Sequence, residues 1–506
     1  MKRLVNSGLV QSEGRDDNVH YLFKHSLIQE AAYQSILKTA RPTLHRRICE
    51  TIEGDPALAQ SMSLEFLAYH SLEAGMRRKS IDYLRRAGQS ASERSASQEA
   101  VHHLNRALEL LALEPEGSER DRDELQILVV LGPVLMATEG SGSAGTTEIY
   151  RRAMELCATL PESPEHFAAS WGWWRIHMNM NFTEGRKWAD RLVDLAGRLD
   201  DPGLLLQAHH CQWATLFNIG EQVECLQHVD VGLPLYDPAS HHRHASLYGG
   251  HDPRCAVSGR APCPAGCWAA PSRRRAASTM PSRLPSASVT SAAPPRHGHR
   301  LMLDRYRDDP AAVLERSTSM IRFAYQQSLP DYRAKGEFFT GWAHGKLVDA
   351  REGIGKMKLG MDTLLAIGTR EDFPVYFEML AEICGILGEP RPGLEAIGQA
   401  FDEADRSGLH YWDAELHRRR GELIRMLADA DPAEVEGCFR RALQVARAQQ
   451  TLALELRAAR SLARVHFDRG ARKEALALLE PVYARFSEGW RRTRLVSAAS
   501  MLRSLS

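Results

Sequence analysis

Apolar residues recur at every third or fourth position over most of the chain from about residue 62 onward. This periodicity gathers the apolar side chains on one helix face, so it predicts a nearly all-helical chain. Glycine, proline or an Asp-Pro pair, which punctuate helices, stands at the predicted connections. The predicted helices span 62–74, 79–94, 97–112, 122–138, 145–159, 165–180, 184–199, 203–219, 222–235, 309–328, 331–348, 351–367, 373–387, 391–406, 410–428, 432–449, 452–468, 472–486 and 491–504.

Pairs of predicted helices share one spacing. A small residue in the first helix is followed by a loop glycine at +7, a second small residue at +12 and apolar or small residues at +16 and +19. Small side chains let two helices cross closely, so the spacing predicts helix pairs folded back on themselves. The matching sets are Ala68, Gly75, Ser80, Leu84 and Ala87; Ala381, Gly388, Gly393, Ile397 and Ala400; and Ala463, Gly470, Ala475, Leu479 and Val482.

The crossing position recurs with a period of about 40 residues, which predicts an all-α solenoid of stacked helix pairs. Gly341, Ala381, Gly421 and Ala463 follow one another at steps of 40, 40 and 42 residues. Gly172 and Trp213 are 41 apart, although tryptophan fits a close crossing poorly. The distance from Trp213 to Gly341 is 128 residues, about three periods, so two crossings are expected near 255 and 298.

Residues 253–300 do not continue this pattern. They contain no Asp, Glu, Ile, Phe or Tyr, and they hold eight prolines and the run Arg273-Arg274-Arg275. A disordered linker is one interpretation of such a composition. We favour a frameshifted stretch that replaces a repeat, because the period is kept in register across it. Both interpretations predict a solenoid interrupted at this segment.

The first 50 residues differ from the remainder. Strands are predicted at 8–11 and 19–23, and a helix with an apolar face is predicted from His25. This order is typical of the end of a winged-helix module, with no helix expected before it. The expected organisation is therefore a winged-helix remnant at 1–55, repeats at 56–252, the irregular segment at 253–300 and repeats at 301–506.

Composition sets further bounds on function. Lys and Arg together number 64, as do Asp and Glu, so no global charge favours nucleic acid or an anionic membrane. The nine cysteines follow no disulfide or metal spacing, which favours a reduced, cytoplasmic protein. No apolar run approaches the length of a membrane span, and no signal-peptide pattern follows Met1.

Three motifs invite a chemical interpretation that their context does not support. Gly140 to Gly145 matches a dinucleotide fingerprint, but predicted helices flank it on both sides, so a turn is expected. Gly345-Lys346 and Gly355-Lys356 lack the remainder of a phosphate-binding loop. Cys263 and Cys267 lack regular zinc spacing. We therefore expect no catalytic, cofactor-binding or metal-binding residue.

Tryptophans cluster on two successive predicted pairs, at Trp171, Trp173, Trp174 and Trp213. Packing between the pairs explains such a cluster. The alternative is a partner groove that uses Trp171, Trp174 and Trp213, because concave solenoid surfaces bind peptides through aromatic side chains.

Several stretches resemble one family of bacterial signalling proteins. They are Tyr21 to Tyr33, Leu44 to Ile48, Ala68 to Gly75, Ile81 to Gly88 and Glu415 to Leu423. They are similar to the C-terminal part of proteins that join a class III adenylate/guanylate cyclase, a STAND-type AAA ATPase and tetratricopeptide repeats. The resemblance implies that the fold is an all-α, tetratricopeptide-like helical-repeat solenoid with a short N-terminal winged-helix remnant. No stretch matches the cyclase or ATPase sites, so the resemblance implies a non-catalytic fragment that begins inside the winged-helix end of the ATPase module. It also implies a protein or peptide partner in the concave groove, with no membrane contact.

Two other classes of function stay open at this point. A cyclase or ATP-dependent regulator is suggested by the family as a whole, and would show nucleotide turnover. A transcription regulator would use the winged-helix remnant for DNA binding by residues 1–60, although nucleic acid is the less favoured partner.

Overall fold

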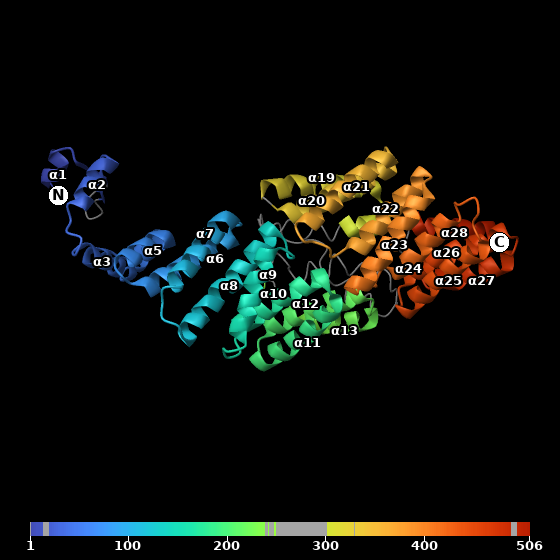
Figure 1. Cartoon of the computed structure of the whole chain (residues 1–506), viewed down its shortest axis with the longest axis horizontal. Coiled ribbons are helices and arrows are strands. Elements are labelled where there is room, and N and C mark those ends of the chain that lie inside the picture. Colours follow the sequence, from blue (N-terminus) through green and yellow to red (C-terminus); the bar gives the residue numbers. More distant parts are fainter. Residues whose placement is uncertain are drawn as a thin grey trace. The chain divides into compact units, whose positions relative to one another are not determined.

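The computed structural model describes residues 2–13, 20–237, 241, 247–248, 301–327, 329–486 and 493–505, and nearly all of them are helical or in short turns (Figure 1). The chain divides into two compact units. One unit holds Met1–Ala91 and Gln98–Glu116, and the other holds Ser92–Ser97 and Gly117–Ser506. Within the described ranges, no helix is both long and apolar enough to cross a membrane.

The first unit begins with a short helix and a small hairpin and continues into further helices. Its elements are α1 (Lys2–Asn6), β1 (Val10–Glu13), β2 (His20–Phe23), α2 (Ser26–Gln34), α3 (Arg41–Glu53), α4 (Pro56–Ser61), α5 (Leu64–Glu73), α6 (Arg77–Glu93) and α7 (Ser97–Leu111). The strands pair antiparallel, with Val10 opposite Phe23. The hairpin and α2 confirm the predicted elements, but α1 precedes them where no helix was expected. Their assignment to a winged helix stays a prediction.

The predicted crossing of the first unit is present between α5 and α6. The Ser80 hydroxyl donates to the Ala68 carbonyl oxygen at 2.8 Å, so the two small residues stand at the closest approach. Gly75 has φ of +76°, which suits the tight turn between the helices. The repeated spacing therefore marked the helix crossing correctly here.

The second unit is a series of helices packed on their neighbours in sequence. Its elements are α8 (Ser118–Glu139), α9 (Ala144–Cys157), α10 (Pro164–Met180), α11 (Phe182–Leu199), α12 (Pro202–Ile219), α13 (Gln222–Gly232), η1 (Leu233–Leu235), α19 (Pro310–Gln326), α20 (Pro330–Leu347), α21 (Ala350–Ala366), α22 (Phe373–Leu387), α23 (Pro390–Ser407), α24 (Asp413–Ile424), α25 (Pro432–Ala448), α26 (Leu452–Asp468), α27 (Arg472–Ala484) and α28 (Thr493–Leu505). The first helices of successive pairs, α20, α22, α24 and α26, also contact one another. This is the helical-repeat architecture that the period predicts.

Close crossings in this unit occur at the predicted positions. A Cβ on Gly341 would lie 2.8 Å from the Met357 backbone nitrogen. Because glycine has no side chain, the backbone of α20 approaches the backbone of α21 directly at this position. Trp213 also occupies a crossing, because the Cys225 thiol reaches its carbonyl oxygen at 3.3 Å. The indole fits because Gly232 opposes it, and a Cβ there would lie 2.7 Å from the ring.

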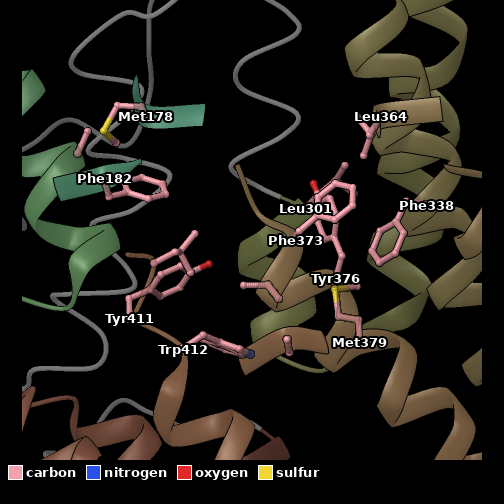
Figure 2. Close-up of a cluster of buried hydrophobic side chains, with 14 of the residues drawn as sticks. Met178, Phe182, Leu301, Phe338, Leu364, Phe373, Tyr376, Met379, Tyr411 and Trp412 are labelled. Atoms are coloured by element: carbon pink, nitrogen blue, oxygen red, sulfur yellow. The ribbon is translucent and has the colours of Figure 1, made fainter. Parts of the chain in front are cut away.

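Helices on either side of residues 253–300 share one buried cluster. Figure 2 draws Met178 and Phe182 from the earlier range in the same cluster as Phe373, Tyr376 and Tyr411 from the later one. The predicted crossings near 255 and 298 and the proposed frameshift lie outside the described residues. The domain boundaries at 55/56, 252/253 and 300/301 stay predictions.

A polar contact joins these two ranges, and we call it the Asn179 contact. The Asn179 side-chain amide donates to the Gly368 carbonyl oxygen at 2.6 Å and accepts from the Arg370 backbone N–H at 3.0 Å. Nearby, Arg175 pairs with Glu371 at 2.8 Å. The glycine-rich motif at Gly140 to Gly145 is the expected turn between α8 and α9, and its Gly142 lies directly against Gly368.

Candidate functional site

A groove of about 460 Å³ opens on the face formed by α20, α22, α24 and α26. Its lining includes an apolar strip of Gly385, Ile386, Leu423 and Met426, in which Leu423 is only 1% exposed. Ile386 is 52% exposed and Met426 is 46% exposed. Exposed aliphatic side chains beside a groove offer contact area to a ligand.

The walls of the groove are predominantly basic. Six cationic residues line it: Lys346, Arg418, Arg419, Arg425, Arg457 and Arg460. Three carboxylates face them: Asp308, Glu382 and Glu422. The lining residues therefore carry an excess of three positive charges, which the buried Glu415 and Glu378 partly offset, and the remaining positive balance favours an anionic ligand.

Two further carboxylates lie beneath the lining and fix the guanidinium groups. Glu415 accepts from Arg418 at 2.6 Å and also pairs with Arg457. Glu378 has no exposed surface and accepts from Arg419 at 2.9 Å and from the Trp412 indole at 3.2 Å. Planar guanidinium groups held by buried carboxylates keep one orientation, which pre-organises the groove.

Glu382 and Ser461 extend this network across the helices. Glu382 accepts from the Trp342 indole at 2.9 Å and pairs with Arg419 at 3.0 Å. The Ser461 hydroxyl donates to Glu422 at 2.7 Å, which ties α26 to α24. Four successive first helices thus share one polar network.

Charge in this network sets the pKa of its carboxyl groups. Burial alone would raise the pKa of Glu415, but the positive charges of Arg418 and Arg457 outweigh it and hold the pKa well below its ordinary value. Burial would also raise the pKa of Glu382. The positive charges of Arg419 and Arg305 outweigh this effect and hold its pKa well below the usual range.

These depressed pKa values predict acid sensitivity. A carboxyl group that is more acidic in the folded state stabilises the fold above its unfolded pKa, and that contribution is lost as pH falls toward the folded value. We expect the free energy of unfolding, measured with urea at a series of pH values, to decline below about pH 4.5. The Glu415→Gln variant should show a shallower decline, whereas the exposed-site variant Glu395→Gln should follow the native curve. Parallel curves for the native chain and Glu415→Gln would contradict this expectation.

The tryptophans of the alternative partner groove lie inside the protein. Trp171, Trp174 and Trp213 are 1%, 3% and 2% exposed. The Trp174 indole donates to the Thr215 hydroxyl at 2.9 Å, and the Trp171 and Trp174 rings lie 5.8 Å apart. They are core residues in this structure, which is the packing interpretation that the sequence left open. Side chains elsewhere must line any groove that meets a partner.

The basic groove was not singled out from the sequence. Glu415, Arg418, Arg419 and Glu422 follow the spacing of one helix face, and this charged stripe was the available signal. Such stripes usually face water, so the sequence alone favours a solvated surface. Lys346, set aside as part of a false phosphate-loop motif, lines the groove as well.

One cluster among the described residues has groups that could hold a metal ion. Side-chain atoms of Glu65, Glu99 and His103 lie within 4.8 Å of one another in the first unit. The His103 Nε2 atom lies 3.4 Å from Glu65 and 3.9 Å from Glu99. No further observation at this cluster points to a ligand.

Comparison with known proteins places the chain beside a longer relative. No protein-family model matches it. An uncharacterized protein of Rhizobium meliloti (strain 1021) is 30% identical over 448 residues, covering 87% of this chain and 43% of the relative. The chain therefore spans less than half the length of this curated relative.

Solved structures with some likeness are helical-repeat proteins of low sequence identity. A Rap protein complexed with competence and sporulation factor is 11% identical, covers 84% of this chain and 99% of its own, and gives a TM-score of 0.36. A STAND protein with a tetratricopeptide repeat sensor from Pyrococcus horikoshii is 8% identical. The match covers 100% of this chain and 60% of that protein's chain, and its TM-score is 0.31. Scores of this size carry no assignment, so the fold class rests on the helix pairs of the chain itself.

Proposed function

We propose that this chain is a non-catalytic interaction module that binds a protein or peptide in the groove lined by α20, α22, α24 and α26. The observation that carries the proposal is the open groove itself, with its fixed arginines and its exposed aliphatic mouth. Successive repeats build extended binding surfaces of this kind without a dedicated active site. The proposal includes a cytoplasmic location, which rests on the cysteine pattern.

The proposal extends to control of an attached enzyme in longer relatives. The resemblance to cyclase and ATPase proteins supports it, as does the greater length of the Rhizobium relative. Partner binding would favour one arrangement of the stacked helices, and that bias would reach the attached domain.

The exposed apolar side chains of the N-terminal hairpin and α2 support the presence of such a domain in the longer relatives. No side chain of α2 is buried, and Leu27 and Leu37 are 81% and 75% exposed. Tyr21, Leu22 and Phe23 on β2 are each more than 40% exposed. Exposed apolar residues in this number are typical of a surface that packs against another part of a protein, and the remainder of a winged-helix module would provide that part.

Selection from a random peptide library on the purified chain tests the proposed function. We expect enriched peptides whose binding is lost when Ile386 and Met426 are both changed to serine, because the aliphatic mouth then disappears. The matched control is Leu359→Ser on α21, where a leucine 63% exposed lies outside the groove lining. Peptides that bind both variants equally, or a library that yields none, would contradict the proposal.

A further inference from the structure

We propose that the groove selects an acidic peptide in which a carboxylate side chain stands next to an aliphatic one. This inference deepens the proposed function, on which it rests, by stating the chemistry of the partner. Two observations support it: the lining has more positive than negative side chains, and it includes the apolar strip.

The positive charge at the mouth is the first argument. Arg425 is 46% exposed at its side chain, and its contacts with Glu422 and Asp468 are long, at 3.4 and 3.5 Å. A ligand carboxylate that accepts two parallel N–H bonds from a guanidinium forms a shorter and stronger pair than these. The deeper Arg418 and Arg457 are committed to Glu415, so Arg425 is the arginine of the lining whose donors a ligand carboxylate can take.

The apolar strip is the second argument, and it separates a peptide from a purely anionic ligand. Ile386 and Met426, the exposed members of the strip, line the same groove as Arg425. Methionine adapts its shape to varied side chains, which suits a peptide anchor. A polyanion such as DNA would use the arginines and leave the strip uncovered, so the strip favours a chain that carries both kinds of side chain.

Charge also decides against the chain's own irregular segment as the occupant. Residues 253–300 contain arginines and no Asp or Glu, so they repel a basic lining. The occupant with complementary charge is a separate, acidic polypeptide.

Fluorescence anisotropy on the whole chain tests this inference with defined probes. The probes are a rhodamine-labelled peptide of alternating Glu and Leu, the same peptide with Gln for Glu, and a single-stranded DNA oligonucleotide. We expect the Glu peptide to bind about tenfold more tightly than the Gln peptide, and its affinity to fall as salt increases. DNA should not compete for the peptide.

Variants locate the effect. Changing Arg425 and Arg460 together to glutamine should weaken Glu-peptide binding about tenfold and leave Gln-peptide binding unchanged. The control is Arg440→Gln on α25, since Arg440 pairs with Glu436 and neither residue belongs to the lining. Circular dichroism shows whether each variant stays folded, and the salt dependence of the native chain reports on charge without any variant.

The outcomes separate this inference from the proposed function. Equal affinity for the Glu and Gln peptides, with loss of both in the Ile386→Ser and Met426→Ser double variant, overturns the acidic preference and keeps the interaction module. Effective competition by the oligonucleotide overturns a peptide ligand in favour of nucleic acid. Failure of the peptide library overturns the proposed function itself.

Discussion

Replacing Glu378 with alanine is expected to lower the free energy of unfolding of the second unit by about 3–5 kcal/mol, the usual cost of removing one partner from a buried ion pair. Glu378 has no exposed surface, and it accepts hydrogen bonds from Arg305, Arg419 and the Trp412 indole. Removing the carboxylate takes this acceptor from Arg305 and from the Trp412 indole, both of which are buried, whereas Arg419 keeps its pair with Glu382. Arg305 has a side chain only 2% exposed, so it has no route to solvent.

Urea unfolding followed by circular dichroism measures this cost, and hydrogen exchange in α22 and α24 localises it. The matched control is Glu395→Ala on α23, an exposed glutamate for which a change within about 0.5 kcal/mol is expected. A loss below about 1 kcal/mol for Glu378→Ala would mean that water or a shifted side chain compensates the guanidinium groups.

Replacing Gly142 with alanine is expected to destabilise the second unit by about 1–3 kcal/mol, because it forces overpacking at a place that cannot yield. A Cβ on Gly142 would lie 2.0 Å from the Gly368 carbonyl oxygen and 2.5 Å from the Asn179 amide nitrogen. The nearest obstacle is a backbone atom of Gly368, which cannot rotate away as a side chain can. The segments around Gly142 and Gly368 must therefore move apart. Separation would also break the Asn179 contact.

Thermal melting and hydrogen exchange at residues 367–370 measure this effect. Gly197→Ala on α11 is an informative control, because nothing lies within 4 Å of a Cβ at Gly197. Alanine in a helix interior is favoured over glycine, so this control should gain about 0.5–1 kcal/mol. If both substitutions stabilise the chain, the close approach at Gly142 is not present in solution.

Much of the fold follows from local pattern. Helix pairs and their crossings are local in sequence, so Ser80 against Ala68 and Gly341 against Met357 could be predicted from spacing. Helix bounds agree closely too, and the predicted 373–387 and 452–468 are the bounds of α22 and α26. The predicted 410–428 is longer than α24 because turns occupy both ends.

Other features could not be predicted because their partners lie far away in sequence. Gly142 was correctly placed in a turn, but its need for glycine comes from Gly368, and no periodicity links the two. The groove depends on which faces of four helices meet. The charged residues of α24 have the spacing of an ordinary solvated helix face. What sets them apart is that Arg419 donates to the fully buried Glu378 on α22, a contact that the sequence does not reveal.

The Asn179 contact changes what truncation does to this protein. An array in which each repeat touches only its neighbours can be shortened from either end, and the remaining repeats keep their surroundings. Here Asn179 and Gly368 are 189 residues apart and share a hydrogen bond. Shortening the chain past either residue strips the far partner as well as the neighbouring repeat. Deletion boundaries chosen from repeat edges alone would therefore misjudge the stability of the second unit, because they overlook this long-range contact.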